Sequence, residues 1–480
     1  MINRGLCFDE LTISRLFGNE AAENEEISRL KEYYFKNETY TQISANLPLR
    51  ILVGHKGIGK SALFNVAQQE DMAKNIIVVS IKPDDIVQLN SDSHNFLSTI
   101  RSWKEGLSEL IAKKILISIG SGNKEFGNLK QSGGKVLDFL ESTFRNYICE
   151  ANVDLTPAKA KLVQRFLRNH QVSVYIDDLD RGWKGRDNDI TQLSALLNAV
   201  RDLSKENKGL NFKVSLRSDV YYLYRTSDES TDKIEGSVIW QSWTQHEILV
   251  MLIKRIETFF GRDLDQGQLR GGADISRYLN PVFERVFRGT GHWKNQPMHN
   301  VIMALNRKRP RDLVKLCTLA ARSAREMGVS KIGTENMKAV FKPYSQGRLQ
   351  DTINEYRSEL PGIERLLMNM KPNREQRRSK VHKGYIYTTG ELLKKISNIE
   401  QGGVFRFRSG SVATTKELAA FMYKINFLVA RRPGRVERTY FEEDWYLLNQ
   451  FADFGYHWEV HPAFRWALPM ETMEDLYHQI

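Results

Sequence analysis

Short apolar runs alternate with amphipathic segments along the first half of the chain. The runs have the length and the β-branched content of buried strands. They lie at residues 50–53, 75–81, 172–176, 212–217 and 237–240. Strands that alternate with helices predict an α/β fold with a parallel sheet, and such sheets hold their ligands at the carboxyl edge.

The pattern becomes helical after residue 260. Residues 300–327 have the apolar spacing of two amphipathic helices, broken at Pro310. Further along, helical patterns at 390–399 and 415–429 precede two short strands around a Pro433–Gly434 turn. Helices followed by a basic hairpin resemble a winged helix, so we expect a winged-helix-like domain at this end of the chain.

The first apolar run leads into the sequence GHKGIGKS at residues 54–61, which satisfies G-x-x-x-x-G-K-[ST]. The glycines let the backbone turn so that consecutive amides face a polyphosphate, and the helix expected from about Lys60 directs its positive end at the same anion. Lys60 would reach the β- and γ-phosphates of ATP, and Ser61 would offer its hydroxyl to Mg²⁺. The residues expected to bind nucleotide are Gly54, His55, Lys56, Gly57, Ile58, Gly59, Lys60, Ser61 and Ala62.

Carboxylates follow the strand at 172–176, where the sequence continues IDDLDR. We assign Asp177 to the Mg²⁺ shell and Asp178 to the attacking water, with Asp180 as the alternative for the second role. The strand at 212–217 ends in Arg217, which either contacts the γ-phosphate or forms an ordinary salt bridge.

These motifs resemble those of additional-strand P-loop ATPases of the AAA+, STAND and KAP classes. IDDLDR is similar to the acidic strand of KAP-type NTPases, and LRSD at 216–219 lies where those proteins carry a sensor residue. Residues 15–30 resemble the box that precedes the phosphate loop in STAND and origin-recognition ATPases and helps to enclose the adenine.

The same resemblance extends to RKRPRDLVKL at 307–316, which is similar to the start of a sensor-2 helix and implies that Arg311 contacts the nucleotide from a helical lid. The chain departs from AAA+ proteins in having Asp178 where a glutamate is usual, which implies slow hydrolysis. Arg255 is a weak candidate for an arginine finger, and we interpret it as structural.

Together, the patterns divide the chain into four parts. The expected parts are a helical lead-in (1–47), a P-loop core with a helical insertion at 84–170 (48–260), a helical lid (261–345) and a basic winged-helix-like domain (346–480).

Most of the net charge of +12 lies in one segment. Residues 371–440 contain sixteen Lys and Arg against five Asp and Glu, and the remaining chain is almost balanced. Such a module predicts contacts with DNA, for which the candidate phosphate contacts are Arg431, Arg432, Arg435 and Arg438. A solvated basic surface and a patch for an acidic protein are the alternatives.

The remaining composition excludes several classes. No apolar run approaches the 18 or so residues that span a bilayer, so we expect no membrane partner. The N-terminal segment is acidic where a signal peptide is apolar, and the three cysteines (Cys7, Cys149, Cys317) are widely separated, so we expect a cytoplasmic protein. His457 and His461 are four residues apart, but Pro462 and the flanking aromatics favour packing or hydrogen bonding over a metal site.

Two functions remain open on the sequence. One is an ATP-operated switch of a bacterial conflict system, such as antiphage defence, that forms a homo-oligomer and acts with a separate effector protein. The other is a DNA-acting motor or loader that uses the basic C-terminal domain. No nuclease, deaminase or protease motif is visible, which favours the switch.

Overall fold

The structure is a computed structural model, and it divides into two compact units. The first unit comprises Met1–Phe35, Lys56–Gly59 and Ser242–Ile480, and the second comprises Lys36–His55 and Lys60–Gln241. The residues that it describes are 6–21, 24–86, 95–120, 171–179, 181, 183, 185–227, 232–262, 264, 275–290, 293–372, 384–434, 437–444, 447 and 455–468.

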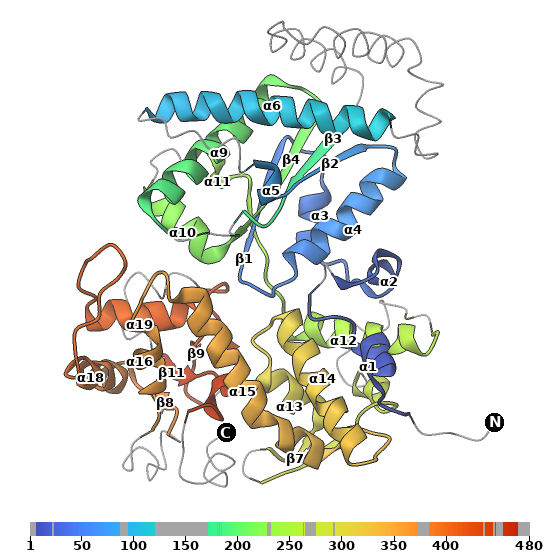
Figure 1. The fold of residues 1–480 in the computed structure, drawn as a ribbon. Coiled ribbons are helices and arrows are strands. Elements are labelled where there is room, and N and C mark those ends of the chain that lie inside the picture. The colour runs from blue at the N-terminus through green and yellow to red at the C-terminus, as the bar shows by residue number, and fades with distance from the viewer. Residues whose placement is uncertain are drawn as a thin grey trace, which may run out of the picture. The chain divides into compact units, whose positions relative to one another are not determined.

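A five-stranded parallel sheet forms the centre of the second unit (Figure 1). The strands are β1 (Leu49–Gly54), β2 (Ile77–Ile81), β3 (Val172–Ile176), β4 (Leu210–Arg217) and β5 (Val238–Trp240). Their order is β2-β3-β4-β1-β5, and every pair is parallel. The predicted α/β fold and its parallel sheet are confirmed, and the carboxyl ends of β1, β3 and β4 lie at one edge.

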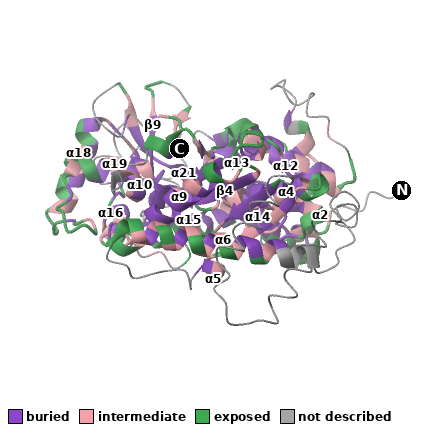
Figure 2. Cartoon of the chain, turned by 90° about the horizontal axis from the view of Figure 1, so that it is seen from above, coloured by how far each residue is buried: buried purple, intermediate pink, exposed green. Residues whose placement is uncertain are grey.

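Helices cover both faces of this sheet. One face carries α3 (Glu38–Ser44) and α4 (Lys60–Ala73), and the other carries α6 (Phe96–Gly120), α9 (Asp187–Glu206) and α10 (Ser218–Ser227) (Figure 1). Strands buried on both faces need continuous apolar runs, and β3 and most of β4 are accordingly buried (Figure 2). The short helices α5 (Pro83–Ile86) and α11 (Asp232–Glu235) complete the described part of this unit.

A buried polar network ties α4 to the sheet. Lys213 Nζ of β4 donates to Asp71 Oδ2 and to the Tyr175 hydroxyl, each over 2.8 Å, and that hydroxyl donates to Asp71 over 2.7 Å. Burial lowers the pKa of Lys213 and raises the pKa of Tyr175. The network therefore fixes the helix that follows the phosphate loop against β3 and β4.

The first unit is mainly helical. The elements are α1 (Glu10–Phe17), α2 (Ile27–Tyr33), α12 (Gln245–Phe259), η6 (Ile275–Leu279), β6 (Val286–Arg288), β7 (Lys294–Pro297), α13 (Met298–Leu305), α14 (Pro310–Glu326), α15 (Thr334–Tyr356) and α16 (Ile363–Met368). The helices α1 and α2 lie within residues 1–47, which were predicted as a helical lead-in, and the predicted break at Pro310 is confirmed. Proline suits the first turn of α14 because no intrahelical partner awaits its missing N–H.

Asp312 in the first turn of α14 is the centre of a buried ionic cluster. Arg307 donates to it through Nε over 2.6 Å and through Nη2 over 3.1 Å, and Arg348 of α15 donates over 2.7 Å. The Asp312 side chain is 1% exposed. Burial alone would raise the pKa of Asp312, but the two guanidinium groups outweigh burial and hold it well below its ordinary value.

A four-stranded antiparallel sheet and three capped helices follow in the same unit. The strands, in the order β10-β9-β11-β8, are β8 (Ile386–Tyr387), β9 (Leu428–Arg431), β10 (Arg438–Thr439) and β11 (His457–Val460), and the helices are α18 (Thr389–Glu400), α19 (Thr415–Lys424) and the short α21 (Pro462–Arg465). The hairpin predicted around Pro433–Gly434 is confirmed. The prediction of a helix through residue 429 is wrong, because α19 ends at Lys424 and Asn426 turns the chain with φ 57°.

The arginines of this hairpin are engaged within the unit. Glu459 is buried and pairs with Arg465, with Arg438 over 3.0 Å and with Arg431 over 3.4 Å. Burial alone would raise the pKa of Glu459, but Arg438 and Arg465 outweigh burial and lower it to about 2. Arg438 and Arg431 are thus engaged by a buried carboxylate, and their contacts with phosphate stay a prediction, while Arg432 lies over the Tyr456 ring at 5.4 Å.

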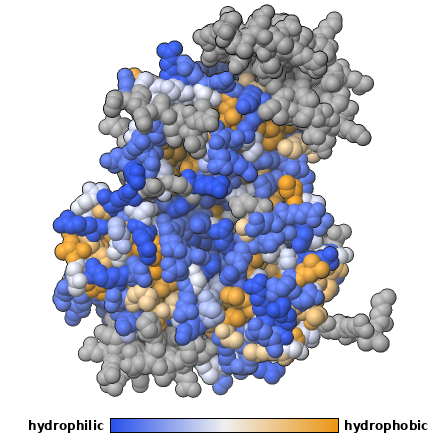
Figure 3. Space-filling view, viewed as in Figure 1, coloured by the Kyte–Doolittle hydropathy of each residue, from blue (hydrophilic) through white to orange (hydrophobic). Residues whose placement is uncertain are grey.

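Hydrophilic residues dominate the face drawn in Figure 3. Within the described residues, no helix has the length and apolar character needed to cross a membrane. The insertion beyond residue 120 and Arg435, which was predicted to contact phosphate, lie outside the described residues.

Candidate nucleotide-binding site

The loop after β1 has the backbone that its glycines predict. β1 ends at Gly54 and α4 begins at Lys60, with Gly57 and Gly59 between them at φ 79° and 102°. Such positive φ angles are open to glycine at little cost. The predicted order of strand, loop and helix is confirmed, and Lys60 Nζ donates to the carbonyl oxygens of Gly54 over 3.0 Å and His55 over 3.4 Å.

His55 holds the start of the loop to a neighbouring strand. Its ring is buried, and its Nδ1 lies 2.9 Å from the Ser218 hydroxyl at the beginning of α10, directly after β4. The sequence marked LRSD as a whole but gave Ser218 no role. The pairing of β1 with β4 brings this serine next to the loop, since Gly54 lies opposite Arg217.

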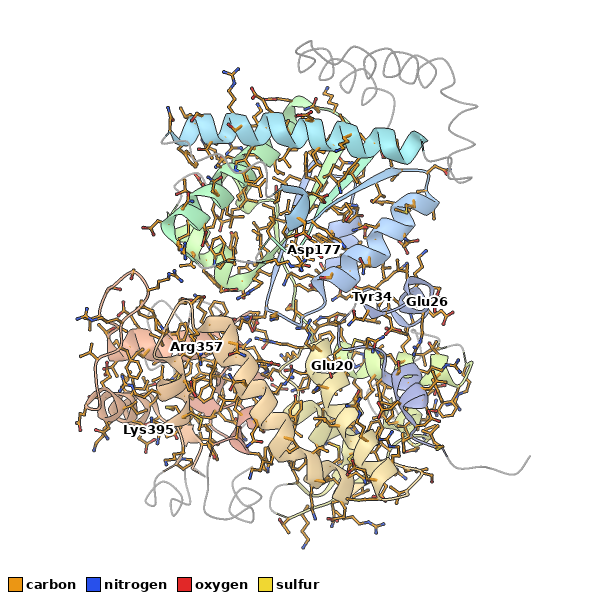
Figure 4. The ribbon with its side chains drawn as sticks, in the orientation of Figure 1. Glu20, Glu26, Tyr34, Asp177, Arg357 and Lys395 are labelled. Atoms are coloured by element: carbon orange, nitrogen blue, oxygen red, sulfur yellow. The ribbon has the colours of Figure 1, made fainter. Side chains whose placement is uncertain are left out.

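Two carboxylates stand at the same edge of the sheet. Asp177 follows β3, and its Oδ1 accepts from the Ser215 hydroxyl of β4 and from the N–H of Asp178 (Figure 4). Asp178 is exposed, with φ 58°, a left-handed conformation that aspartate tolerates. Asp177 is thus oriented by its neighbours and Asp178 faces outward, whereas Asp180 lies outside the described residues.

Arg217 is engaged in an ion pair at the end of β4. Its Nε and Nη2 donate to the two oxygens of Asp219 over 3.0 Å and 2.6 Å. The structure therefore shows the salt bridge that was one of two interpretations of Arg217. Contact with a γ-phosphate stays a prediction.

The tip of the loop, Lys56–Gly59, belongs to the first unit and contacts α14 there. The N–H of Arg311 donates to the Gly57 carbonyl over 3.3 Å. A Cβ on Gly57 would lie 3.0 Å from Arg311 Cβ and 3.2 Å from its Cδ, so this position needs glycine for space as well as for backbone angle. The Arg311 Nε donates to the carbonyl of Glu20, a residue labelled in Figure 4.

Three further residues hold the loop tip, and sequence patterns gave no role to any of them. Trp243 Nε1 donates to the Ile58 carbonyl over 2.8 Å, and Arg309 Nη1 donates to the Lys56 carbonyl over 3.4 Å. Glu355 of α15 accepts from the Lys56 N–H over 3.2 Å. The one local indication of a role was for Arg309, which lies beside Arg311 in the sequence RKRPRD.

Arg255 is structural, as we interpreted it. It is buried, donates to the Phe17 carbonyl and lies over the Tyr33 ring at 4.3 Å. A Cβ on Gly18 would lie 2.5 Å from the Arg255 Nη1. Gly18 and Arg255 therefore shape the segment after α1 that resembled the adenine box.

A metal site made by protein side chains alone is not seen in the described part of the chain, where no group of three or more His, Cys, Asp and Glu could hold an ion. His461 instead hydrogen bonds Tyr440 over 2.8 Å, as the packing interpretation expected. Ser61 and Asp177 supply the oxygen ligands that Mg²⁺ prefers, and phosphate oxygens would complete such a shell.

The strand order β2-β3-β4-β1-β5, the GHKGIGKS loop and the acidic end of β3 define the P-loop NTPase fold. Residues 247–353, which run from α12 into α15, match the FunZ-associated C-terminal helical domain.

One curated relative is the putative transposon gamma-delta 80.3 kDa protein of Escherichia coli strain K12, 23% identical over 387 residues. The alignment covers 73% of this chain and 53% of the relative, so the chain spans about half the length of the curated relative that it matches.

Among solved structures, a Walker-type ATPase of Pyrococcus abyssi is similar with a TM-score of 0.43 and 11% identity, covering 91% of this chain and 96% of that one. The ORC2 protein of Aeropyrum pernix, solved as ADPNP–ADP complexes, has a TM-score of 0.42 and 12% identity, with 96% and 97% covered. Both TM-scores lie below 0.5, so the fold assignment rests on the strand order and the loop of this chain.

Proposed function

We propose that the chain binds ATP with Mg²⁺ and hydrolyses it slowly. The observation that carries this proposal is the edge of the sheet in the second unit, where Lys60 and Ser61 open α4 and Asp177 ends β3. The positive helix terminus and the ammonium favour a polyphosphate, and the oriented carboxylate favours the metal that accompanies it.

Each residue then has one role. Lys60 neutralises charge on the β- and γ-phosphates, and Ser61 and Asp177 hold Mg²⁺ directly or through water. Asp178, exposed beside Asp177, orients the attacking water. Asp180 remains the alternative for that last role.

The lid contributes Arg311, whose side chain packs on Gly57 within the first unit. Arg217 would contact phosphate only by leaving Asp219, so we place it second to Arg311 as a group that distinguishes ATP from ADP.

The test compares Lys60 with a lysine outside the loop. Lys60→Ala should abolish hydrolysis and weaken binding of MgATP, because the transition state loses a cation beside the β- and γ-phosphates. Lys74→Ala is the matched control, since Lys74 is exposed, follows α4 directly and lies outside the loop. Equal rates for wild type and Lys60→Ala in contaminant-free preparations would refute the site.

We further propose that ATP operates a conformational switch in a bacterial conflict system, with oligomer formation and a separate effector protein. The Escherichia coli relative is named as a transposon protein, which fits conflict between a cell and mobile DNA. The absence of nuclease, deaminase and protease motifs in the sequence also supports a regulator.

The alternative function is a DNA-acting AAA+-like motor or loader. The sixteen basic residues at 371–440 favour it, although Arg431 and Arg438 are paired with Glu459. Measuring the ATPase rate with and without duplex DNA separates the two functions. A loader should be stimulated strongly, whereas a switch triggered by protein should not respond.

A further inference from the structure

A buried ion pair holds both backbone groups of one phosphate-loop residue. Glu355 Oε1 accepts from the N–H of Lys56 over 3.2 Å, while Arg309 Nη1 donates to the carbonyl of the same residue over 3.4 Å. Arg309 Nη1 also lies 3.7 Å from Glu355 Oε2, and the two side chains are 3% and 4% exposed. The pair thus fixes the orientation of the peptide planes on both sides of Lys56.

The pair is poorly suited to a purely stabilising role. Within the described part of the chain, neither Nε nor Nη2 of Arg309 has a hydrogen-bond partner. A buried guanidinium with unused donors is costly, and a buried ion pair is often no more stable than the apolar residues that would replace it. The contacts that the pair makes with the phosphate loop therefore explain its presence better than stability does.

Because peptide groups are planar, these contacts determine the direction in which the N–H groups of the loop point. In a trans peptide the C=O of one residue and the N–H of the next point in opposite directions. The carbonyls of Lys56, Gly57 and Ile58 are held by Arg309, by the Arg311 N–H and by Trp243. The N–H groups of Gly57, Ile58 and Gly59 must therefore point away from these three partners, and this shared direction is the one in which such a loop binds a phosphate.

The same argument applies on the other side of Lys56. Because Glu355 holds the Lys56 N–H, the carbonyl of His55 points the opposite way, and that carbonyl accepts from Lys60 Nζ over 3.4 Å.

We infer that Glu355, together with Arg309, is a positioning residue for the phosphate loop. It acts through the backbone of Lys56, aims the loop amides at the polyphosphate, and touches no reacting atom. This inference rests on the proposed nucleotide site. It adds that a helix encoded about 300 residues after the loop determines whether the loop can bind.

The experiment uses the full chain with Glu355→Ala, Glu355→Gln and the control Glu359→Ala. Glu359 pairs with Lys424 over 2.7 Å, its side chain is 16% exposed, and it lies just beyond α15 without a described contact to the loop. A fluorescent ATP analogue gives Kd, steady-state hydrolysis gives kcat and KM, and circular dichroism gives Tm.

Glu355→Ala should weaken MgATP binding about tenfold or more, since it removes a charge-assisted hydrogen bond that shapes the loop. Glu355→Gln should retain part of the affinity, because its amide oxygen can still accept from Lys56. Glu359→Ala should lower Tm without changing Kd. Wild-type Kd and kcat in Glu355→Ala, or losses in both alanine variants that merely follow Tm, would overturn the inference.

Failure of the nucleotide site itself would look different. If wild type and Lys60→Ala both bound no ATP, the proposed function would fall first. If wild type bound ATP, Lys60→Ala did not, and Glu355→Ala matched wild type, the positioning role alone would be wrong.

Discussion

Asp312→Asn should destabilise the first unit far more than its size suggests. The substitution conserves volume but replaces a charged acceptor by an amide that has one oxygen and two N–H donors. Arg307 donates to both oxygens of Asp312 and Arg348 donates to one of them. An asparagine at this site must turn its N–H donors toward a guanidinium, which leaves the buried Arg307 without its carboxylate partner and Arg348 with only the exposed Asp351.

The magnitude follows from burial. The side chains of Asp312, Arg307 and Arg348 are 1%, 3% and 5% exposed, so solvent screens them little. Removing one partner of such a buried pair costs about 3–5 kcal/mol. For a domain of about 150–250 residues, each kcal/mol lowers Tm by roughly 2–4 °C, so the expected decrease is about 6–20 °C.

Asp351→Asn is the matched control, because Asp351 pairs with the same Arg348 over 2.9 Å but is 55% exposed. An exposed pair contributes about 0–1 kcal/mol, so its Tm should change by a few degrees at most. Differential scanning calorimetry resolves the two units if they melt separately. Equal, small shifts for Asp312→Asn and Asp351→Asn would refute the reasoning, because burial would then not determine the value of the pair.

The remaining predictions concern the site, pH and assembly. Asp178→Asn should leave ATP affinity within a few-fold of wild type and reduce the rate of hydrolysis by about 100-fold, whereas Asp177→Asn should weaken Mg²⁺-dependent binding of ATP. Isothermal titration measures the binding, and phosphate release measures the hydrolysis. If Asp178→Asn hydrolysed ATP at the wild-type rate, orienting the water would be assigned to Asp180. The pKa of Glu459 is lowered from 4.5 to about 2, so its contribution to stability is complete above pH 4.5 and is lost as pH falls toward 2. In Glu459→Gln, the free energy of unfolding should therefore depend less on pH between about 4.5 and 2 than it does in the wild type. The same pH dependence in both proteins would contradict this. In sedimentation, the wild type should form a larger species with ATP than with ADP. Arg311→Ala should abolish this difference while it still binds nucleotide. If the wild type sedimented identically with both nucleotides, the motor would be favoured over the switch.

The parts of the fold that were predictable are those that local sequence determines. The apolar runs had to be strands buried on both faces, and the loop from Gly54 to Ser61 combines its glycines, lysine and hydroxyl within eight consecutive residues. Pro310 marked the start of α14 because its ring is compatible with a first helical turn and with little else in a helix.

The parts that were missed depend on distant partners. Ser215 meets Asp177 because β3 pairs with β4, and Glu355 meets Lys56 across 299 positions, and neither spacing leaves a periodic trace. Arg438 shows a different difficulty, in which the local pattern is visible but does not reveal the partner of the side chain. An arginine in a basic hairpin has the same local pattern whether it faces solvent or a buried carboxylate, and Glu459 lies 21 residues further on.

The length of α15 has a consequence for the design of truncated forms of the protein. This helix runs from Thr334 to Tyr356 with Pro343 inside it, and it is about 35 Å long at 1.5 Å per residue. A truncation after residue 345, where the sequence alone suggested the end of a lid, would expose the helix at mid-length and discard the turns that carry Arg348 and Glu355. A shortened protein made in that way should precipitate or lose nucleotide. Cleavage sites for separating the C-terminal sheet belong beyond Tyr356.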